Sequence, residues 1–169
     1  MIVRRAELSE LDQIMEIYDS ARAFMRSRGN MSQWINGYPS RERITKDIRR
    51  EQCYVCEQEG QLAGVFAFIL GEDRTYQVIT EGHWRSDSPY GTVHRLASSG
   101  RWPGVSWACF TFCKSRIGHV RADTHAENKV MQRALEANGF VCCGVIHVED
   151  GSSRLAYEYL ADEAEPSVQ

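Results

Sequence analysis

A chain of 169 residues with a net charge of −3, 43% apolar and 25% charged, has the composition of an ordinary soluble globular protein, not of a disordered one. The negative balance argues against a nucleic-acid partner, which needs a basic face, and no apolar run approaches the roughly 18 residues of a membrane span. We expect one domain over residues 1–160, a loose tail over 161–169 and a cytoplasmic location, because the N-terminus lacks the apolar core of a secretory signal.

The six cysteines are predicted to be free thiols, because a chain without an export signal is not expected to carry a disulfide framework. Cys53 and Cys56 fall in a strand-like run and point to opposite faces, whereas Cys109 and Cys113 lie one helical turn apart in an apolar stripe. No second paired-cysteine cluster at ligand spacing is present, so no metal site is predicted.

The N-terminal quarter predicts a strand followed by two helices. Residues 2–5 have the strand pattern, and Ser9 stands at capping-box spacing from Asp12, before an amphipathic helix that ends near residues 28–30. Ser40 can cap the second helix. The segment between the two helices is predicted to be a loop.

The middle of the chain predicts a β-hairpin and then a long polar segment. Residues 53–57 and 62–70 are typical of a hairpin whose second strand, apolar on both faces, lies centrally in a sheet. The polar segment 71–90 is predicted to be a loop with one further strand at 76–80.

The second half predicts, in order, a strand at 92–97, a helix at 105–116, a strand at 120–124, a helix opened by Asn128 and ended at Gly139, and strands at 140–148 and 154–160. The first three of these elements form a βαβ unit, which requires a parallel pair of strands. Asp150-Gly151 favours a hairpin turn between the last two strands.

The stretch "SSGRWPGVSW", residues 98–107, joins a predicted strand to a predicted helix. A glycine-containing loop at a helix N-terminus directs unpaired backbone N–H groups and positive dipole charge toward one point, which favours a phosphate. Gly100 and Gly104 allow backbone angles closed to other residues, and Arg101 can neutralise an anion. A plain strand-to-helix turn would carry the same generic pattern.

Two motifs make the reading more specific. Arg101-Trp-Pro-Gly104-Val-Ser106 resembles the Arg/Gln-x-x-Gly-x-Gly/Ala signature of the GNAT superfamily of acyl-CoA-dependent N-acyltransferases. "DTHAENKVMQRALEANGF" is similar to the later segment of that superfamily, in which an asparagine, here Asn128, opens a helix that ends in Gly-Phe. The resemblance implies an α/β fold, α+β in some schemes, with a mixed sheet of about six to seven strands flanked by four helices.

The resemblance also implies acetyl-CoA as co-substrate and a set of residues that bind it. The loop amides would hold the pyrophosphate, and the backbone of the fourth strand would pair with pantetheine where that strand splays from the fifth. The residues implied are Leu96, Ala97, Ser98, Arg101, Trp102, Gly104, Val105, Ser106 and Asn128.

The sequence departs from the superfamily pattern at three points. Ser106 replaces the last small glycine or alanine, and the loop between Ala97 and Arg101 is about two residues shorter than usual. Leu135 stands where a tyrosine often protonates the departing CoA thiolate. A general acid, if the protein uses one, must therefore lie elsewhere.

Transfer of an acetyl group to an amine needs a base for the ammonium proton, and three residues are candidates. Glu81 follows a strand-like segment on the expected substrate side, and His94 lies in the fourth strand near the thioester. His125 alternates with Asp123 onto one strand face, where the two could form a proton relay. For the two histidines, a purely structural hydrogen bond is the alternative.

The acceptor is predicted to be a primary amine of a small molecule, peptide or protein. The loop aromatics Trp34, Tyr38, Trp84 and Tyr90 are candidates for the acceptor pocket, the alternative being that they cover the core. The negative charges of Glu81 and Asp87 favour a cationic acceptor. Dimers are common in the superfamily, and a homodimer is left open.

Two other functions compete with the enzyme. With Leu135 at the usual acid position, the domain could bind acyl-CoA without turnover, as a sensor or interaction module. A nucleotide-binding α/β domain ranks last, because the sequence lacks the phosphate-loop lysine and the three-glycine dinucleotide fingerprint.

Overall fold

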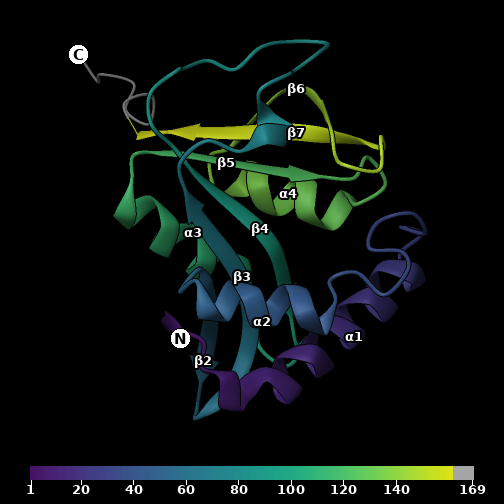
Figure 1. Ribbon diagram of the computed structural model, residues 1–169, viewed down its shortest axis with the longest axis vertical. Helices are drawn as coiled ribbons and strands as arrows, with labels where there is room; N and C mark the ends of the chain where they lie inside the picture. Colours follow the sequence, from purple (N-terminus) through teal and green to yellow (C-terminus); the bar gives the residue numbers. More distant parts are fainter. Residues whose placement is uncertain (162–169) are drawn as a thin grey trace.

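A computed structural model describes residues 1–161 of the chain, which are built around one mixed seven-stranded sheet of order β1-β2-β3-β4-β5-β7-β6 (Figure 1). The strands are β1 (Ile2–Arg5), β2 (Cys53–Gln58), β3 (Gln61–Leu70), β4 (Gly91–Ser98), β5 (His119–Thr124), β6 (Val141–His147) and β7 (Ser153–Leu160). All neighbouring pairs are antiparallel except β4 and β5. The predicted βαβ unit and the predicted fold class are both confirmed.

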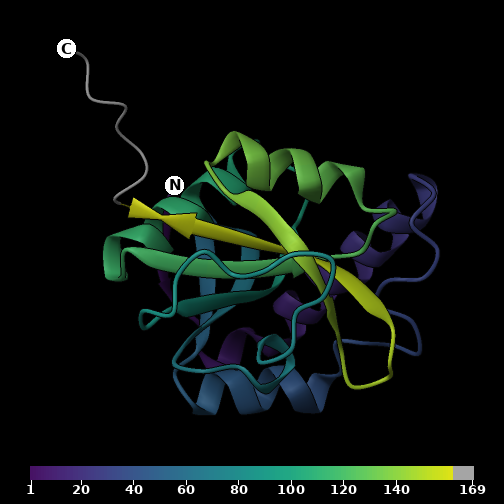
Figure 2. The ribbon, with the colours of Figure 1, turned by 90° about the horizontal axis from the view of Figure 1, so that it is seen from above.

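Two helices cover each face of the sheet. The helices α1 (Leu11–Ser27) and α2 (Arg41–Arg49) pack on one face through a cluster that includes Ile14, Ile44 and Val55. The helices α3 (Val105–Arg116) and α4 (Lys129–Ala137) cover the other face (Figure 2). The predicted caps of α2 and α4 are present, because Ser40 accepts from Arg43 N and Asn128 accepts from Met131 N.

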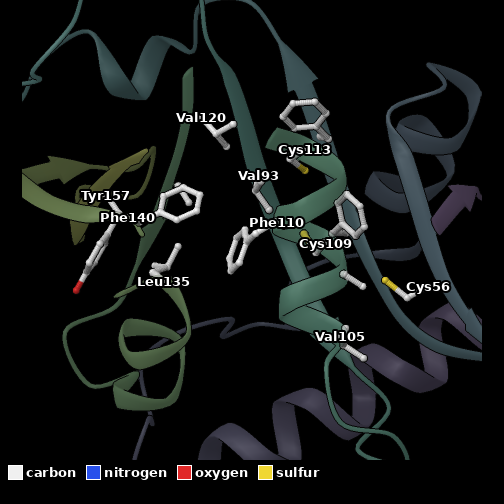
Figure 3. Close-up of a cluster of buried hydrophobic side chains, with 14 of the residues drawn as sticks. Cys56, Val93, Val105, Cys109, Phe110, Cys113, Val120, Leu135, Phe140 and Tyr157 are labelled. Atoms are coloured by element: carbon white, nitrogen blue, oxygen red, sulfur yellow. The ribbon is translucent and has the colours of Figure 1, made fainter. Parts of the chain in front are cut away.

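The larger core lies between the sheet and the second pair of helices. Val105, Cys109 and Cys113 follow one face of α3 at a spacing of four residues (Figure 3). Phe110 packs against Phe140 with ring centroids 4.9 Å apart. Burial of each such apolar side chain stabilises the fold by about 1.5–3 kcal/mol. This core fixes the position of the α3 N-terminus, where the glycine loop ends.

The strands β4 and β5 are paired only at their start and then separate. Their parallel register covers Gly91–Val120, Thr92–Arg121 and Val93–Ala122, whereas β4 stays paired with β3 as far as Ser98. The register between β3 and β4 shifts around Arg95, which adopts a left-handed φ of 55°. An extra residue of this kind bends a strand, and Figure 1 shows β4 turning away from β5.

Two local predictions are wrong. Residues 76–80 form no strand: a short 3-10 helix, η2 (Arg74–Tyr76), is followed by a single bridge between Thr80 and Val145. Ser9 does not cap the first helix, because the short 3-10 helix η1 (Leu8–Glu10) comes first and Glu10 Oε2 accepts from Glu7 N at 2.9 Å. Both segments are polar, and polar residues of this kind also form turns. The strand pattern and the cap spacing therefore did not distinguish these turns from the predicted structures.

The six cysteines are all free, as predicted, with Cys53 and Cys56 in the cores of opposite faces. Within residues 1–161, no helix is long and apolar enough to cross a membrane. The predicted tail lies outside the described residues from position 162 onward.

Candidate active site

A cleft of about 590 Å³ opens where β4 and β5 separate. Its walls come from α2, the loop between α1 and α2, the segment after β3, the ends of β4 and β5, and the hairpin between β6 and β7. Phe110 of α3 and Met131 of α4 also line it, so the cleft is bounded by residues from both faces of the sheet. The separation of the two strands therefore opens a cleft between the two faces of the sheet.

His94 faces this cleft and is held by a carboxylate. Its Nε2 lies 2.7 Å from Asp73 Oδ2, and each of the two side chains is about one fifth exposed, at 20% and 21%. Burial acts to raise the pKa of Asp73, but the hydrogen bonds from His94 and Thr75 outweigh it and lower that pKa to about 2. The charged Asp73 carboxylate therefore orients the imidazole of His94.

A second hydrogen-bonded pair stands beside the first. The Tyr76 hydroxyl donates to Asp123 Oδ1 at 2.6 Å, and the Tyr76 ring lies 6.1 Å from the His94 ring. Burial raises the pKa of Tyr76 well above its ordinary value, so the phenol stays protonated. Thr124, the next residue of β5, has a buried hydroxyl oxygen without a hydrogen-bond partner in the described part of the chain. It lines the cleft and is available to a ligand.

The strand bulge places a buried ion pair at the wall formed by α2. Arg95 donates from Nε to Asp47 Oδ2 at 2.9 Å and from Nη1 to the Tyr38 hydroxyl at 3.1 Å. The Arg95 and Asp47 side chains are only 8% and 4% exposed. The Tyr18 hydroxyl donates to the Arg95 carbonyl at 2.8 Å, which holds the bulge itself. This wall is therefore rigid and tied to both helices of its face.

The glycine loop ends at the N-terminus of α3 as predicted. Gly104 caps the helix with a left-handed φ of 87°, and its carbonyl accepts from Ala108 N at 2.9 Å. The amides from Val105 to Trp107 precede this first helical bond and point out of the helix. Gly100 N and Arg101 N are instead used within the loop, by the hydroxyls of Ser98 and Ser99. The first-turn amides of α3 are thus left for a ligand, whereas those of Gly100 and Arg101 are not.

The loop between α1 and α2 is bound to the start of α4. Gln33 Oε1 accepts from Asn30 Nδ2 at 2.9 Å and from Asn128 Nδ2 at 3.0 Å, all three side chains being buried. Trp34 and Tyr38 of this loop line the cleft, and their role in binding the acceptor stays a prediction. Asn128 lines it too, but its side chain is engaged as the helix cap and as a donor to Gln33.

Several predicted site residues lie away from the cleft. Glu81 is exposed in the turn after the Thr80 bridge, and His125 faces Glu127, whose amide donates to its Nδ1 at 3.1 Å. Among the described residues, no hydrogen bond joins His125 to Asp123, so the proposed relay is not formed. The structure brings only His94 of the three base candidates to the cleft.

The other two aromatic candidates belong to a packing cluster. Trp84 and Tyr90 surround Tyr76, and the Trp84 indole donates to the Tyr76 carbonyl at 2.8 Å. Neither lines the cleft. The alternative reading, that these aromatics cover the core, therefore describes them better. Leu135 is fully buried in the main core.

The sequence reading missed Asp73, Tyr76 and the Asp47–Arg95 pair. Asp73 caps η2 by accepting from Thr75 N, a turn that the spacing of the two residues could have indicated. Its pairing with His94 joins residues 21 positions apart and leaves no local signal.

The comparison with solved structures decides the family. A GNAT-family acetyltransferase from Streptococcus agalactiae 2603 is 34% identical, with a TM-score of 0.87 over 94% of this chain and 94% of that one. The chain belongs to the GNAT family of acetyltransferases. The GNAT-family acetyltransferase from Listeria monocytogenes 4b F2365 has the same fold at 18% identity, with a TM-score of 0.68 over 94% of each chain.

A ribosomal-protein-alanine N-acetyltransferase from Brucella melitensis also shares the GNAT fold, at 14% identity and a TM-score of 0.62 over 95% of this chain and 99% of that one. No protein-family model and no curated protein matches the chain. The structural relatives are acetyltransferases, which supports an acyltransferase-type activity for this GNAT protein.

Proposed function

We propose that the protein is an N-acetyltransferase that transfers the acetyl group of acetyl-CoA to a primary amine by direct attack in a ternary complex. The observation that carries the proposal is His94, fixed by Asp73, at the cleft between the separated β4 and β5. A base within reach of both strands is what an incoming ammonium needs to become a nucleophile.

The residues present fit acetyl-CoA. The first amides of α3 form an anion site for the pyrophosphate, with Arg101 nearby and Gly104 leaving open space above the loop. The side of β4 that faces β5 loses its strand partner after Val93, so its backbone can pair with pantetheine. The unpartnered Thr124 hydroxyl stands at the same opening. When bound there, acetyl-CoA supplies the acetyl thioester.

The chain's own groups then divide the work. His94 Nε2 is held by Asp73, and the imidazole accepts the amine proton directly or through a water. Backbone amides of β4 beyond Val93 stabilise the negative oxygen of the tetrahedral intermediate. The walls from α2 and the loop that carries Trp34 and Tyr38 hold the acceptor amine in line with the thioester.

An assay of thiol release with acetyl-CoA and a panel of primary amines tests this function. We expect amine-dependent release, and a fall in kcat of about 10²–10⁴ for His94→Gln without a change in acetyl-CoA affinity. Glu81→Gln, which changes an exposed carboxylate outside the cleft, is the matched control and keeps its activity. Equal losses in the two variants would contradict the role of His94.

A non-catalytic acyl-CoA-binding module is the second candidate, and the observation that favours it is the buried Leu135 at the usual position of the acid. It predicts that acetyl-CoA binds and that no amine in the panel releases its thiol. The same assay, run beside a binding measurement, separates the two functions.

A further inference from the structure

The wall of the cleft formed by α2 carries two arginines with no carboxylate partner among the described residues. Arg43 and Arg50 both line the cleft. Arg43 lies in α2 and Arg50 is the C-cap residue of that helix, seven positions later, so the two lie on the same side, with Asp47 between them. Asp47 does not neutralise them, since its Oδ2 lies 2.9 Å from Arg95 Nε and 2.8 Å from Arg95 Nη2. The wall therefore carries an uncompensated positive charge.

These arginines stand on the acceptor side of the sheet. The helix α2 packs on the face opposite to α3, whose N-terminus is the candidate phosphate site. Arg95, which is bonded to Asp47, is the next residue after His94 in β4. The buried Asp47–Arg95 ion pair thus connects this positive wall to the strand that carries His94. The wall lies apart from the candidate pyrophosphate site.

The remaining charges of the cleft are mainly acidic. Asp73 and Asp123 stand at the strand ends, and the turn between β6 and β7 adds Glu149 and Asp150, with Arg154 beside them. The acidic end of the cleft near His94 thus suits an ammonium group, while the end at α2, with its two arginines, suits an anion. Glu81 and Asp87, whose charges favoured a cationic acceptor, lie outside the cleft lining.

We infer that the acceptor is an amine that also carries an anionic group, a carboxylate or a phosphonate, which Arg43 and Arg50 bind while the amine faces His94. This inference rests on the proposed function for the reaction and adds the class of acceptor. Arginine binds either anion through paired N–H donors, so the two are alternatives of one chemistry.

Calorimetric binding to the protein saturated with CoA, which cannot react, tests the inference without turnover. The probes are 4-aminobutyrate, 3-aminopropylphosphonate, butylamine and 1,4-diaminobutane, with L-alanine and L-alaninamide as a second matched series. We expect the anionic amines to bind at least tenfold more tightly than their neutral or cationic counterparts. The carboxylate and phosphonate probes show which anion is preferred.

Variants of α2 assign the binding to the two arginines. Arg43→Gln and Arg50→Gln should each weaken binding of the anionic amines by on the order of tenfold, with little effect on butylamine. Lys46→Gln and Arg49→Gln remove the same charge from the same helix away from the cleft and should change nothing. Arg43→Lys should restore part of the loss, because it retains the charge.

Two results would overturn the inference: equal binding of anionic and neutral amines, or equal effects of the four glutamine variants. The proposed function is judged separately by thiol release. Anionic amines that bind without releasing thiol would leave the subsite standing and refute the enzyme. Thiol release with neutral amines alone would support the enzyme and refute the anionic subsite.

Discussion

The contact between His94 and Asp73 is the one on which the proposed mechanism depends. Their side chains meet at 2.7 Å and are only partly exposed, so the carboxylate fixes which imidazole nitrogen carries the proton. Asp73 is itself held at two points. Its Oδ1 accepts from Thr75 N, and its backbone N donates to the Tyr90 hydroxyl at 2.9 Å. In the proposed mechanism, Asp73 therefore acts as a positioning residue for His94.

Asp73→Asn should lower kcat by on the order of tenfold or more, yet less than His94→Gln. Since a pKa of about 2 keeps the carboxylate charged at every assay pH, its loss removes a stabilising charge from the imidazolium. The loss should fall on kcat and leave the affinity for acetyl-CoA unchanged. An equal loss of acetyl-CoA affinity would indicate a structural role only.

The packing of α3 against β3 sets the position of the candidate phosphate site. Gly64 of β3 lies directly under the start of α3, where a Cβ would meet Val105 Cγ1 at 2.3 Å and the Ala97 carbonyl oxygen at 2.9 Å. The second contact is with backbone, so rotation of the Val105 side chain does not relieve it. Only glycine allows the helix N-terminus to sit this close to the sheet.

Gly64→Ala should therefore destabilise the fold by about 1–3 kcal/mol and weaken acetyl-CoA binding by displacing the first turn of α3. Gly118→Ala is the control, because its Cβ meets only the Ala161 Cβ, at 3.2 Å, and its backbone is not in the left-handed region. Thermal melts measure the change in stability, and calorimetric titration of the folded protein with acetyl-CoA measures the change in affinity. Wild-type affinity in Gly64→Ala would show that this packing does not position the site.

Asn128 has two separable roles at the start of α4. Its Oδ1 caps the helix, and its Nδ2 ties the loop of the acceptor wall through Gln33. Asn128→Ala should lose both, at a cost of about 1 kcal/mol for the cap alone. Asn128→Asp keeps the capping oxygen but not the donor, so its stability should lie between the two. Urea denaturation of the three proteins checks the order, and an Asp variant as unstable as Ala would contradict it.

A buried charge cluster joins the long 71–90 segment to the central sheet. Glu158 of β7, fully buried, accepts from His119 Nε2 at 2.7 Å and from Arg85 N at 2.9 Å. Arg121 lies between the Trp84 and Tyr90 rings at 4.0 and 4.1 Å. The cluster therefore fastens the segment that presents Asp73 to His94.

Acid should release this segment. Burial acts to raise the pKa of Glu158, but hydrogen bonds from His119 and the Arg85 backbone lower it from 4.5 to about 2. A folded-state pKa below the unfolded one contributes stability that is complete above about pH 4.5 and is lost as the pH falls toward 2. Asp73 acts in the same direction. Melting temperatures should change little from pH 6 to about pH 4.5 and then fall toward pH 3. A profile that stays flat down to pH 3 would contradict the coupling.

Glu158→Gln should destabilise the protein by about 3 kcal/mol at neutral pH, because it leaves buried cations without their counter-charge. It should also flatten the melting profile between pH 4.5 and 3. The control Glu16→Gln, on the exposed side of α1, should stay within about 0.5 kcal/mol of the wild type. Equal melting temperatures for the two variants would exclude a stabilising role for the cluster.

The sequence allowed prediction of what is local in the chain. The left-handed Gly104, the Asn128 cap and the hairpin at Gly151 each follow from a few adjacent residues. The site depends instead on pairs such as Asp73–His94 and Asp47–Arg95, which join residues 21 and 48 positions apart. No pattern within one element indicates which distant carboxylate a strand residue meets, and so Glu81 could not be told from Asp73.

The thermal stability of the purified protein with acetyl-CoA, and with ATP and NAD as controls, tests whether the cleft between β4 and β5 binds acetyl-CoA. A ligand at 100 times its Kd adds about 2.7 kcal/mol of stability. Acetyl-CoA alone should therefore raise the Tm, by roughly 5–10 °C for a chain of this size. No shift at saturating acetyl-CoA, or an equal shift with ATP or NAD, would contradict the assignment of the cleft between β4 and β5 to acetyl-CoA.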